Sequence, residues 1–167
     1  IRVIKRGLHG TAMLPWDVTE RQAWLVLQYI KTFSPKVWED KGKELGKRIV
    51  LSKDPFGLAH KTSAIEKGKM VYHLVANCQS CHRGYASKQE LDEMSMKKDN
   101  TKFDGPDEEF YNLKPQDTEY GVKNIPPDFT WHVVRSASTV EELAYRIAAG
   151  VGGTTMPSWK ETISDED

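Results

Sequence analysis

Both cysteines of this chain lie in one short stretch, ANCQSCHRG at residues 76–84, and a histidine directly follows the second. Cys78, Cys81 and His82 thus form the pattern C-x-x-C-H. Thiolates and imidazoles are metal ligands, a pair of thiols can cycle through a disulfide, and C-x-x-C-H is also typical of covalent attachment of a c-type haem. Which of these chemistries applies decides most of what the sequence says about function.

A zinc site and a redox dithiol fit the sequence less well than a haem. Structural zinc takes four ligands, so Cys78, Cys81 and His82 would need His73 or a more distant histidine as the fourth. Adjacent ligands at 81 and 82 are also difficult to aim at one small ion. A thioredoxin-like dithiol follows a strand in a βαβ unit, whereas this motif follows a predicted helix. A disulfide across two residues would be strained.

Haem attachment gives each residue of the motif a role. The two thiols would form thioethers with the porphyrin, and His82 would be held beneath the iron as an axial ligand. A lone C-x-x-C-H can arise by chance, so the rest of the chain has to support this interpretation.

The chain contains an internal repeat. Residues 4–19 align without a gap with residues 147–162, and seven positions are identical, all of them Ile, Gly, Thr, Met or Trp. Self-similarity of this kind indicates a repeated structural unit. We therefore expect residues 1–34 to end one unit, 35–62 to be a linker, and 63–167 to contain most of the next unit.

Hydrophobic periodicity and capping residues predict three helices. They are expected at 19–33, at 64–77 behind a Ser63 cap, and at 140–149 behind Ser138 or Thr139. The helix at 19–33 is dense enough in apolar residues to be largely buried. Residues 83–127 are poor in aliphatic side chains and predict long loops with about one helical turn. No stretch alternates with period two, so no strand is expected.

With these elements, residues 63–167 resemble the class I cytochrome c family. The resemblance rests on the first helix with its motif, EKGKMVYHLVANCQSCH, in which Gly68 and Tyr72 match helix-crossing positions, and on the loop GTTMPSW. It implies an all-α cytochrome c fold with long loops around a covalently bound haem c. It also implies that His82 and Met156 are the axial ligands of the iron. Residues 1–34 resemble the end of a preceding domain, which makes Met13 a candidate axial ligand of a second haem.

The same resemblance suggests further contacts with the haem. A loop carbonyl is expected to steady His82, from Pro126 or Pro127, with Pro126 preferred. Trp159 and Trp131 are candidate pocket walls or propionate donors, and His132 is the alternative sixth ligand to Met156. The remaining expectations are propionate contacts from Tyr85 or Arg135, and surface positions for His9, His60 and His73.

A haem with His and Met ligands has no open coordination position, so the function implied is electron transfer rather than catalysis. The chain would relay single electrons between redox partner proteins, with a second haem domain upstream in the parent chain. The alternatives are a haem enzyme of the two-haem peroxidase type, or a cytochrome subunit of a larger oxidoreductase complex. Because c-type attachment takes place outside the cytoplasm in this family, we expect a bacterial periplasmic protein, or one bound through its complex to the outer face of the cytoplasmic membrane.

The composition argues against several kinds of partner. Of the 167 residues, 24 are Lys or Arg and 24 are Asp or Glu, so the formal net charge is zero. A balanced chain does not favour nucleic acid or another strongly charged partner. No apolar run approaches the ~20 residues that cross a bilayer as a helix.

Both ends of the sequence are expected to be cuts through a longer protein. A class I domain closes when its last helix crosses its first, and the helix partner of 64–77 is expected after Asp167. The alternative is that helix 19–33 folds back on 64–77 and closes the domain in permuted order.

Overall fold

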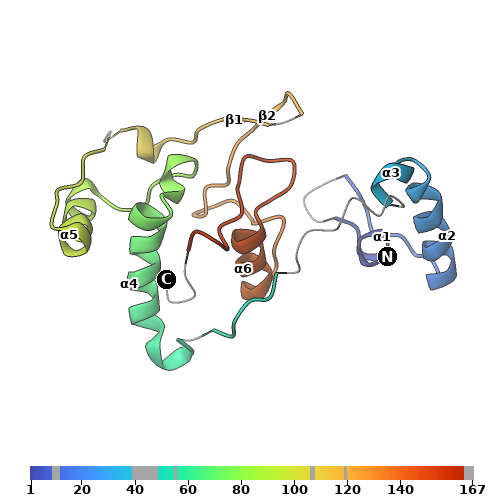
Figure 1. The fold of residues 1–167 in the computed structure, drawn as a ribbon, viewed down its shortest axis with the longest axis horizontal. Coiled ribbons are helices and arrows are strands. Elements are labelled where there is room, and N and C mark those ends of the chain that lie inside the picture. The colour runs from blue at the N-terminus through green and yellow to red at the C-terminus, as the bar shows by residue number, and fades with distance from the viewer. Residues whose placement is uncertain (9–11, 39–48, 55, 106–107, 119, 164–167) are drawn as a thin grey trace. The chain divides into compact units, whose positions relative to one another are not determined.

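The computed structural model describes residues 1–8, 12–38, 49–54, 56–105, 108–118 and 120–163, and the fold is mostly helical (Figure 1). The chain forms two compact units, Ile1–Arg48 and Ile49–Asp167. The boundary lies within the predicted linker, although linker residues 39–48 and the acidic end at 164–167 lie outside the described residues. Closure of the 63–167 domain by a helix after Asp167 stays a prediction, and so does the alternative closure by helix 19–33.

The described residues of the first unit include the helices α1 (Arg2–Arg6), α2 (Glu20–Lys31) and α3 (Pro35–Trp38). A capping box starts α2: the Gln22 backbone N–H donates to Thr19 Oγ1 at 3.3 Å, and the Thr19 N–H donates to Gln22 Oε1 at 2.9 Å. The predicted helix is therefore present, but it is not largely buried. Ala23 is buried in α2, whereas Trp24, Leu25 and Tyr29 are at least half exposed.

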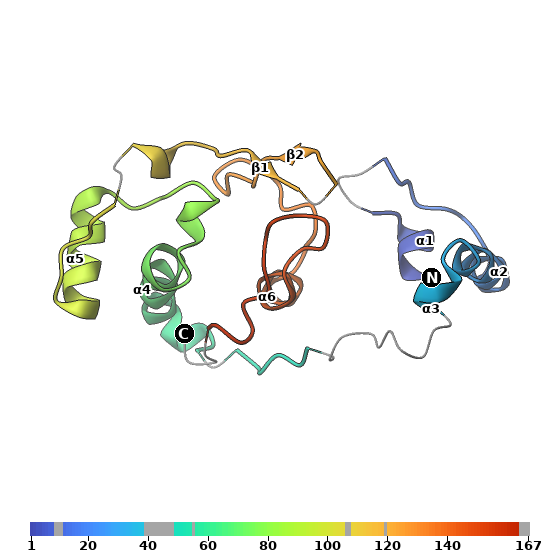
Figure 2. The ribbon, with the colours of Figure 1, turned by 45° about the horizontal axis from the view of Figure 1, so that its top comes forward.

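The second unit begins with η1 (Leu58–His60), α4 (Lys61–Met70), the π-helical turn η2 (Val71–Val75) and the 3-10 turn η3 (Cys78–Ser80). It continues with α5 (Lys88–Asp99), η4 (Glu109–Tyr111), the strands β1 (Gln116–Asp117) and β2 (Lys123–Asn124), and α6 (Val140–Ala149). Figures 1 and 2 both show α5 beside η2 and the upper end of α4. In both views α6 and the loop after it lie to the right of the stretch from α4 to η3, and α5 lies to its left.

Two predictions for residues 83–127 are wrong. The 12-residue helix α5 lies where one helical turn was expected; Ser87 and Glu90 form its capping box, and Leu91 anchors it in the core. The strands β1 and β2 pair in antiparallel fashion, Gln116 with Asn124 and Asp117 with Lys123. A ladder this short needs no period-two pattern, because the turn hydrogen bonds between Thr118 and Val122 hold it together.

The helix starts follow the predictions in part. Thr139 caps α6 by accepting a hydrogen bond from the Glu142 N–H at 3.1 Å. Ser63, however, is not a cap, because α4 already begins at Lys61, directly after η1. None of the helices in the described part of the chain has both the length and the apolar character that crossing a membrane requires.

The sequence repeat is also a structural repeat in the described residues. Gly7 ends α1 with φ 70° and ψ −171°, and Gly150 ends α6 with φ 73° and ψ −176°. The next residue then donates its N–H to the methionine carbonyl, at 3.0 Å from Leu8 to Met13 and at 3.2 Å from Val151 to Met156. Each methionine loop therefore closes on the helix before it in the same way.

We expect Gly150→Ala to destabilise the second unit by about 1–3 kcal/mol, because only glycine readily adopts this region of φ and ψ. A Cβ at Gly150 would also lie 2.7 Å from the Met156 carbonyl oxygen. Urea denaturation measures the free energy of unfolding. Gly152→Ala is the matched control, since a Cβ there meets nothing within 4 Å. Equal stabilities of the two variants would contradict this account of the loop.

Candidate haem-binding site

The C-x-x-C-H motif is one closed turn at the end of a helix. The π-helical turn η2 continues α4 to Ala76, and Asn77 then adopts a left-handed conformation with φ 48° and ψ 43°. The Cys78 carbonyl accepts the N–H of Cys81 at 3.1 Å and the N–H of His82 at 2.8 Å. Both thiols are free and half-buried, and the turn carries them together with the imidazole.

The His82 ring has a defined tautomer. Its Nδ1 lies 3.2 Å from the carbonyl oxygen of Pro127, and a carbonyl only accepts, so Nδ1 carries the proton. The lone pair is then on Nε2, the atom left for a metal. Burial lowers the pKa of His82, which favours the neutral imidazole that ligation requires. The carbonyl is that of Pro127 rather than that of Pro126, the residue preferred from the sequence.

The Pro127 loop also packs on the imidazole. The Phe129 ring stacks on His82 with ring centroids 5.0 Å apart and an interplanar angle of 23°. Asp128 lies between Pro127 and Phe129 in the chain. It is 2% exposed, and its carboxylate accepts hydrogen bonds from Arg83, Tyr85 and Thr130. The orientation of His82 is therefore fixed by a backbone acceptor at one edge and an aromatic ring on one face.

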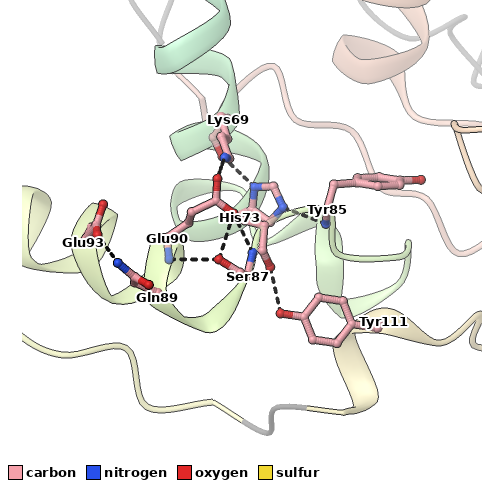
Figure 3. Close-up of polar contacts among 9 residues, drawn as sticks. Lys69, His73, Tyr85, Ser87, Gln89, Glu90, Glu93 and Tyr111 are labelled. Atoms are coloured by element: carbon pink, nitrogen blue, oxygen red, sulfur yellow. Dashed lines mark hydrogen bonds and ion pairs between the residues drawn. The ribbon is translucent and has the colours of Figure 1, made fainter.

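His73 supports the motif from the helix side, as Figure 3 shows. It is buried, not at the surface as predicted. Its Nδ1–H donates to the Lys69 carbonyl at 2.8 Å, and its Nε2 accepts the Tyr85 N–H at 3.1 Å. The His73 carbonyl accepts from Nε2 of Gln79, a fully buried side chain between the two cysteines, at 2.8 Å. His73 thus joins the helix before the motif to the chain after it.

The surroundings of His73 connect it to α5. Lys69 forms an ion pair with Glu90, whose carboxylate also accepts the Ser87 N–H at 2.8 Å (Figure 3). The Tyr111 hydroxyl donates to the Ala86 carbonyl at 2.8 Å. These contacts hold residues 85–90 against the end of α4.

We expect stability to fall as the pH drops below about 6.5, with His73 as one cause. Burial lowers the pKa of His73 below its ordinary value of 6.5. Below pH 6.5 the unfolded chain therefore binds a proton that the native chain does not, so acid favours unfolding. Glu90, whose pKa is lowered to about 2 chiefly by its hydrogen bond from Lys69, acts in a separate window below pH 4.5.

His73→Gln should reduce this pH slope below about pH 6.5 and cost about 1–3 kcal/mol at pH 8, because glutamine does not reproduce both ring contacts, the one to the Lys69 carbonyl and the one from the Tyr85 N–H. Urea denaturation across this pH range measures both effects. His60→Gln, at an exposed histidine of η1, is the control and should change neither. A slope unchanged by His73→Gln would show that His73 is not the titrating group.

The other predicted site residues lie in the second unit, apart from Met13. Met156 and Trp159 are half-buried in the loop after α6, where the Met156 N–H donates to Thr154 Oγ1 at 3.1 Å and the Trp159 N–H donates to the Ile147 carbonyl at 3.3 Å. No hydrogen bond or ring contact among the described residues joins Met156 to the motif. Met13 lies in the matching loop of the first unit.

The alternative ligand His132 and the candidate pocket residue Trp131 lie in the loop that follows Pro127. His132 Nδ1 accepts the Asp128 N–H at 2.9 Å, and the Trp131 ring stacks on His132 and is 67% exposed. One nitrogen of His132 is therefore already engaged. Tyr85 contacts Asp128, and Arg135 is exposed.

These residues fit a covalently bound haem. Two free thiols and an imidazole with a free Nε2 lie on one turn. Large apolar side chains of the second unit remain exposed and suit the apolar face of a porphyrin: Val75, Ile125, Phe129, Val133, Leu143 and Ile147. In the described ranges, no group of three or more His, Cys, Asp or Glu is arranged to hold a metal ion.

Fold and site together define a mostly helical protein in which a C-x-x-C-H turn presents two thiols and a neutral imidazole. Among solved structures, the chain is similar to a chain of the reducing HAO-like protein complex of Kuenenia stuttgartiensis, with 25% identity and a TM-score of 0.64. The similarity covers 99% of this chain and 64% of that chain, so this chain spans less than two thirds of that protein. No family model and no curated protein matches the sequence.

Proposed function

We propose that this chain is a cytochrome subunit of a larger oxidoreductase complex and transfers single electrons through a covalently bound haem c. The observation that carries the proposal is the His82 imidazole, held by the Pro127 carbonyl on a turn that also bears Cys78 and Cys81. Membership of a complex is supported by the similarity to a chain that is itself part of a protein complex.

The residues of the second unit have separate roles in this proposal. Cys78 and Cys81 would hold the porphyrin as thioethers, and His82 would bind the iron through Nε2. Met156 would provide the second ligand of the iron; this assignment rests on the resemblance to class I cytochromes c and on the Met loop that the repeat shares. When bound, such a haem supplies an iron that takes up and releases single electrons. The protein's own part is to orient the ligands and to limit contact of the iron with water.

The first unit suggests a second haem domain in the parent chain. The N–H of Leu8 donates to the Met13 carbonyl as that of Val151 does to the Met156 carbonyl. This likeness supports a role for Met13 as ligand of a second haem. By resemblance to c-type cytochromes, the protein would act in the bacterial periplasm or on the outer face of the cytoplasmic membrane, and would exchange electrons with partner proteins of its complex.

Production of the chain in a host that matures c-type cytochromes tests the proposal. A pyridine haemochrome spectrum counts the haems per chain, and denaturing mass spectrometry shows whether they are covalent. We expect one haem-sized mass addition within residues 63–167. A bare polypeptide mass from properly matured protein would overturn the proposal. Co-purification of the parent protein from its source, followed by redox titration of the assembly, distinguishes a complex subunit from a free carrier.

A further inference from the structure

The buried carboxylate of Asp128 is the centre of a hydrogen-bond cluster that haem attachment does not itself require. Asp128 Oδ1 accepts the Thr130 N–H at 3.0 Å, the Thr130 hydroxyl at 2.7 Å and the Tyr85 hydroxyl at 3.1 Å. Oδ2 accepts from Arg83 Nη1 at 2.9 Å. A carboxylate buried to this extent is tolerated because every contact it makes is with a donor.

The cluster joins the two chain segments that meet at His82. Arg83 follows His82 directly, Tyr85 lies two residues further on, and Asp128 follows Pro127 directly. Tyr85 adds a second link, because its hydroxyl oxygen accepts the Phe129 N–H at 2.7 Å. The His82–Pro127 contact is therefore followed directly by the Arg83–Asp128 bond and then by the bonds of Tyr85 to Asp128 and Phe129.

Asp128 is also fixed through its backbone. Its N–H donates to Nδ1 of His132 at 2.9 Å, and its carbonyl accepts the His132 N–H at the same distance. Both the side chain and the main chain of Asp128 are thus anchored, which leaves the adjacent carbonyl of Pro127 little freedom to turn away from the imidazole.

We propose that Asp128 is a positioning residue for the proximal histidine: its carboxylate bridges residues 83–85 to the loop at 127–130 and so holds the Pro127 carbonyl on His82 Nδ1. The inference rests on the proposed function, because it concerns the imidazole that would bind the iron. A hydrogen bond at Nδ1 makes an imidazole more electron-rich and stabilises the oxidised metal, so the bridge keeps the reduction potential of the loaded protein lower than it would otherwise be.

Two substitutions separate positioning from simple charge. Asp128→Asn removes a negative charge and Arg83→Gln removes a positive one, while both break the same bridge. A pure charge effect shifts the reduction potential up in the first variant and down in the second. Loosening of the His82–Pro127 contact shifts it up in both. Asp117→Asn, at a carboxylate that is 84% exposed, is the control and should leave the potential unchanged.

A second readout does not require the haem. Exchange of the His82 Nδ1–H proton, followed by NMR on the protein as isolated, reports the contact with Pro127 directly. We expect about tenfold faster exchange in Asp128→Asn and in Arg83→Gln, because a hydrogen bond of ordinary strength is weakened. The rate should be unchanged in Asp117→Asn.

Opposite shifts of the potential in the two variants, with unchanged exchange, would overturn the positioning role. If the wild-type chain carries no haem after maturation, the proposed function fails, and the exchange rates in the haem-free protein still decide whether Asp128 positions His82.

Discussion

Replacing both Cys78 and Cys81 with serine should abolish covalent haem attachment, which is the largest effect expected of any change in this chain. Serine keeps the size and polarity of the motif but cannot form a thioether, and the chain has no other cysteine to substitute. Denaturing mass spectrometry after maturation should show the bare polypeptide for this variant and a haem-sized addition for the wild type. The turn itself should persist, because backbone atoms make its hydrogen bonds.

Ser80→Ala is the matched control for this experiment. Ser80 lies between the two cysteines in the same 3-10 turn and is exposed, so its loss should leave haem attachment intact. Retention of covalent haem in the double serine variant would show that the motif is not the attachment site. Loss of haem in Ser80→Ala would show instead that folding of the turn, and not thiol chemistry, is being measured.

Met156→Ala should remove the weak near-infrared sulfur-to-iron band of the oxidised protein. It should also lower the reduction potential by a sizeable part of the ~0.8 V range that axial ligands cover, because a methionine ligand raises the potential. Optical spectra and redox titration measure the two effects. The variant should also bind carbon monoxide in its reduced form, since a coordination position becomes open.

His132→Ala is the comparison that decides between the two candidate ligands. If Met156 is the ligand, this variant should keep the near-infrared band, with disturbance limited to the Asp128 N–H that loses its acceptor. A wild-type protein without the band, whose low-spin spectrum is lost in His132→Ala, would assign the position to His132 and show that the prediction for Met156 is wrong.

Local sequence signals predicted the parts of the site that local structure builds. The C-x-x-C-H turn closes through backbone hydrogen bonds within five residues, and Thr139 caps α6 three residues before its partner. The repeat, with Gly and Met at the same spacing in both copies, predicted that the two methionine loops share one structure. In each case the interacting groups are near neighbours in the chain, so residue types and spacing carry the information.

The supporting contacts were not predictable in this way. His73 is held by the backbone atoms of Lys69 and Tyr85, and a lone histidine in a sequence gives no sign of such partners. Asp128 pairs with Arg83, which lies 45 positions away. The helix α5 did carry a local signal, the Ser87–Glu90 capping box, which low aliphatic content obscured.

The buried side chain of Gln79 has a consequence for protein engineering. Pattern searches treat the two residues between the cysteines as wild cards, yet here they are not equivalent, since Gln79 is 0% exposed and bonded to His73 whereas Ser80 faces solvent. A graft of the five-residue motif onto a designed helix would therefore have to bring Gln79 and a carbonyl at the place of His73 with it. Position 80, by contrast, is exposed, and it offers a point for attaching a dye or an electrode linker beside Cys78 and Cys81.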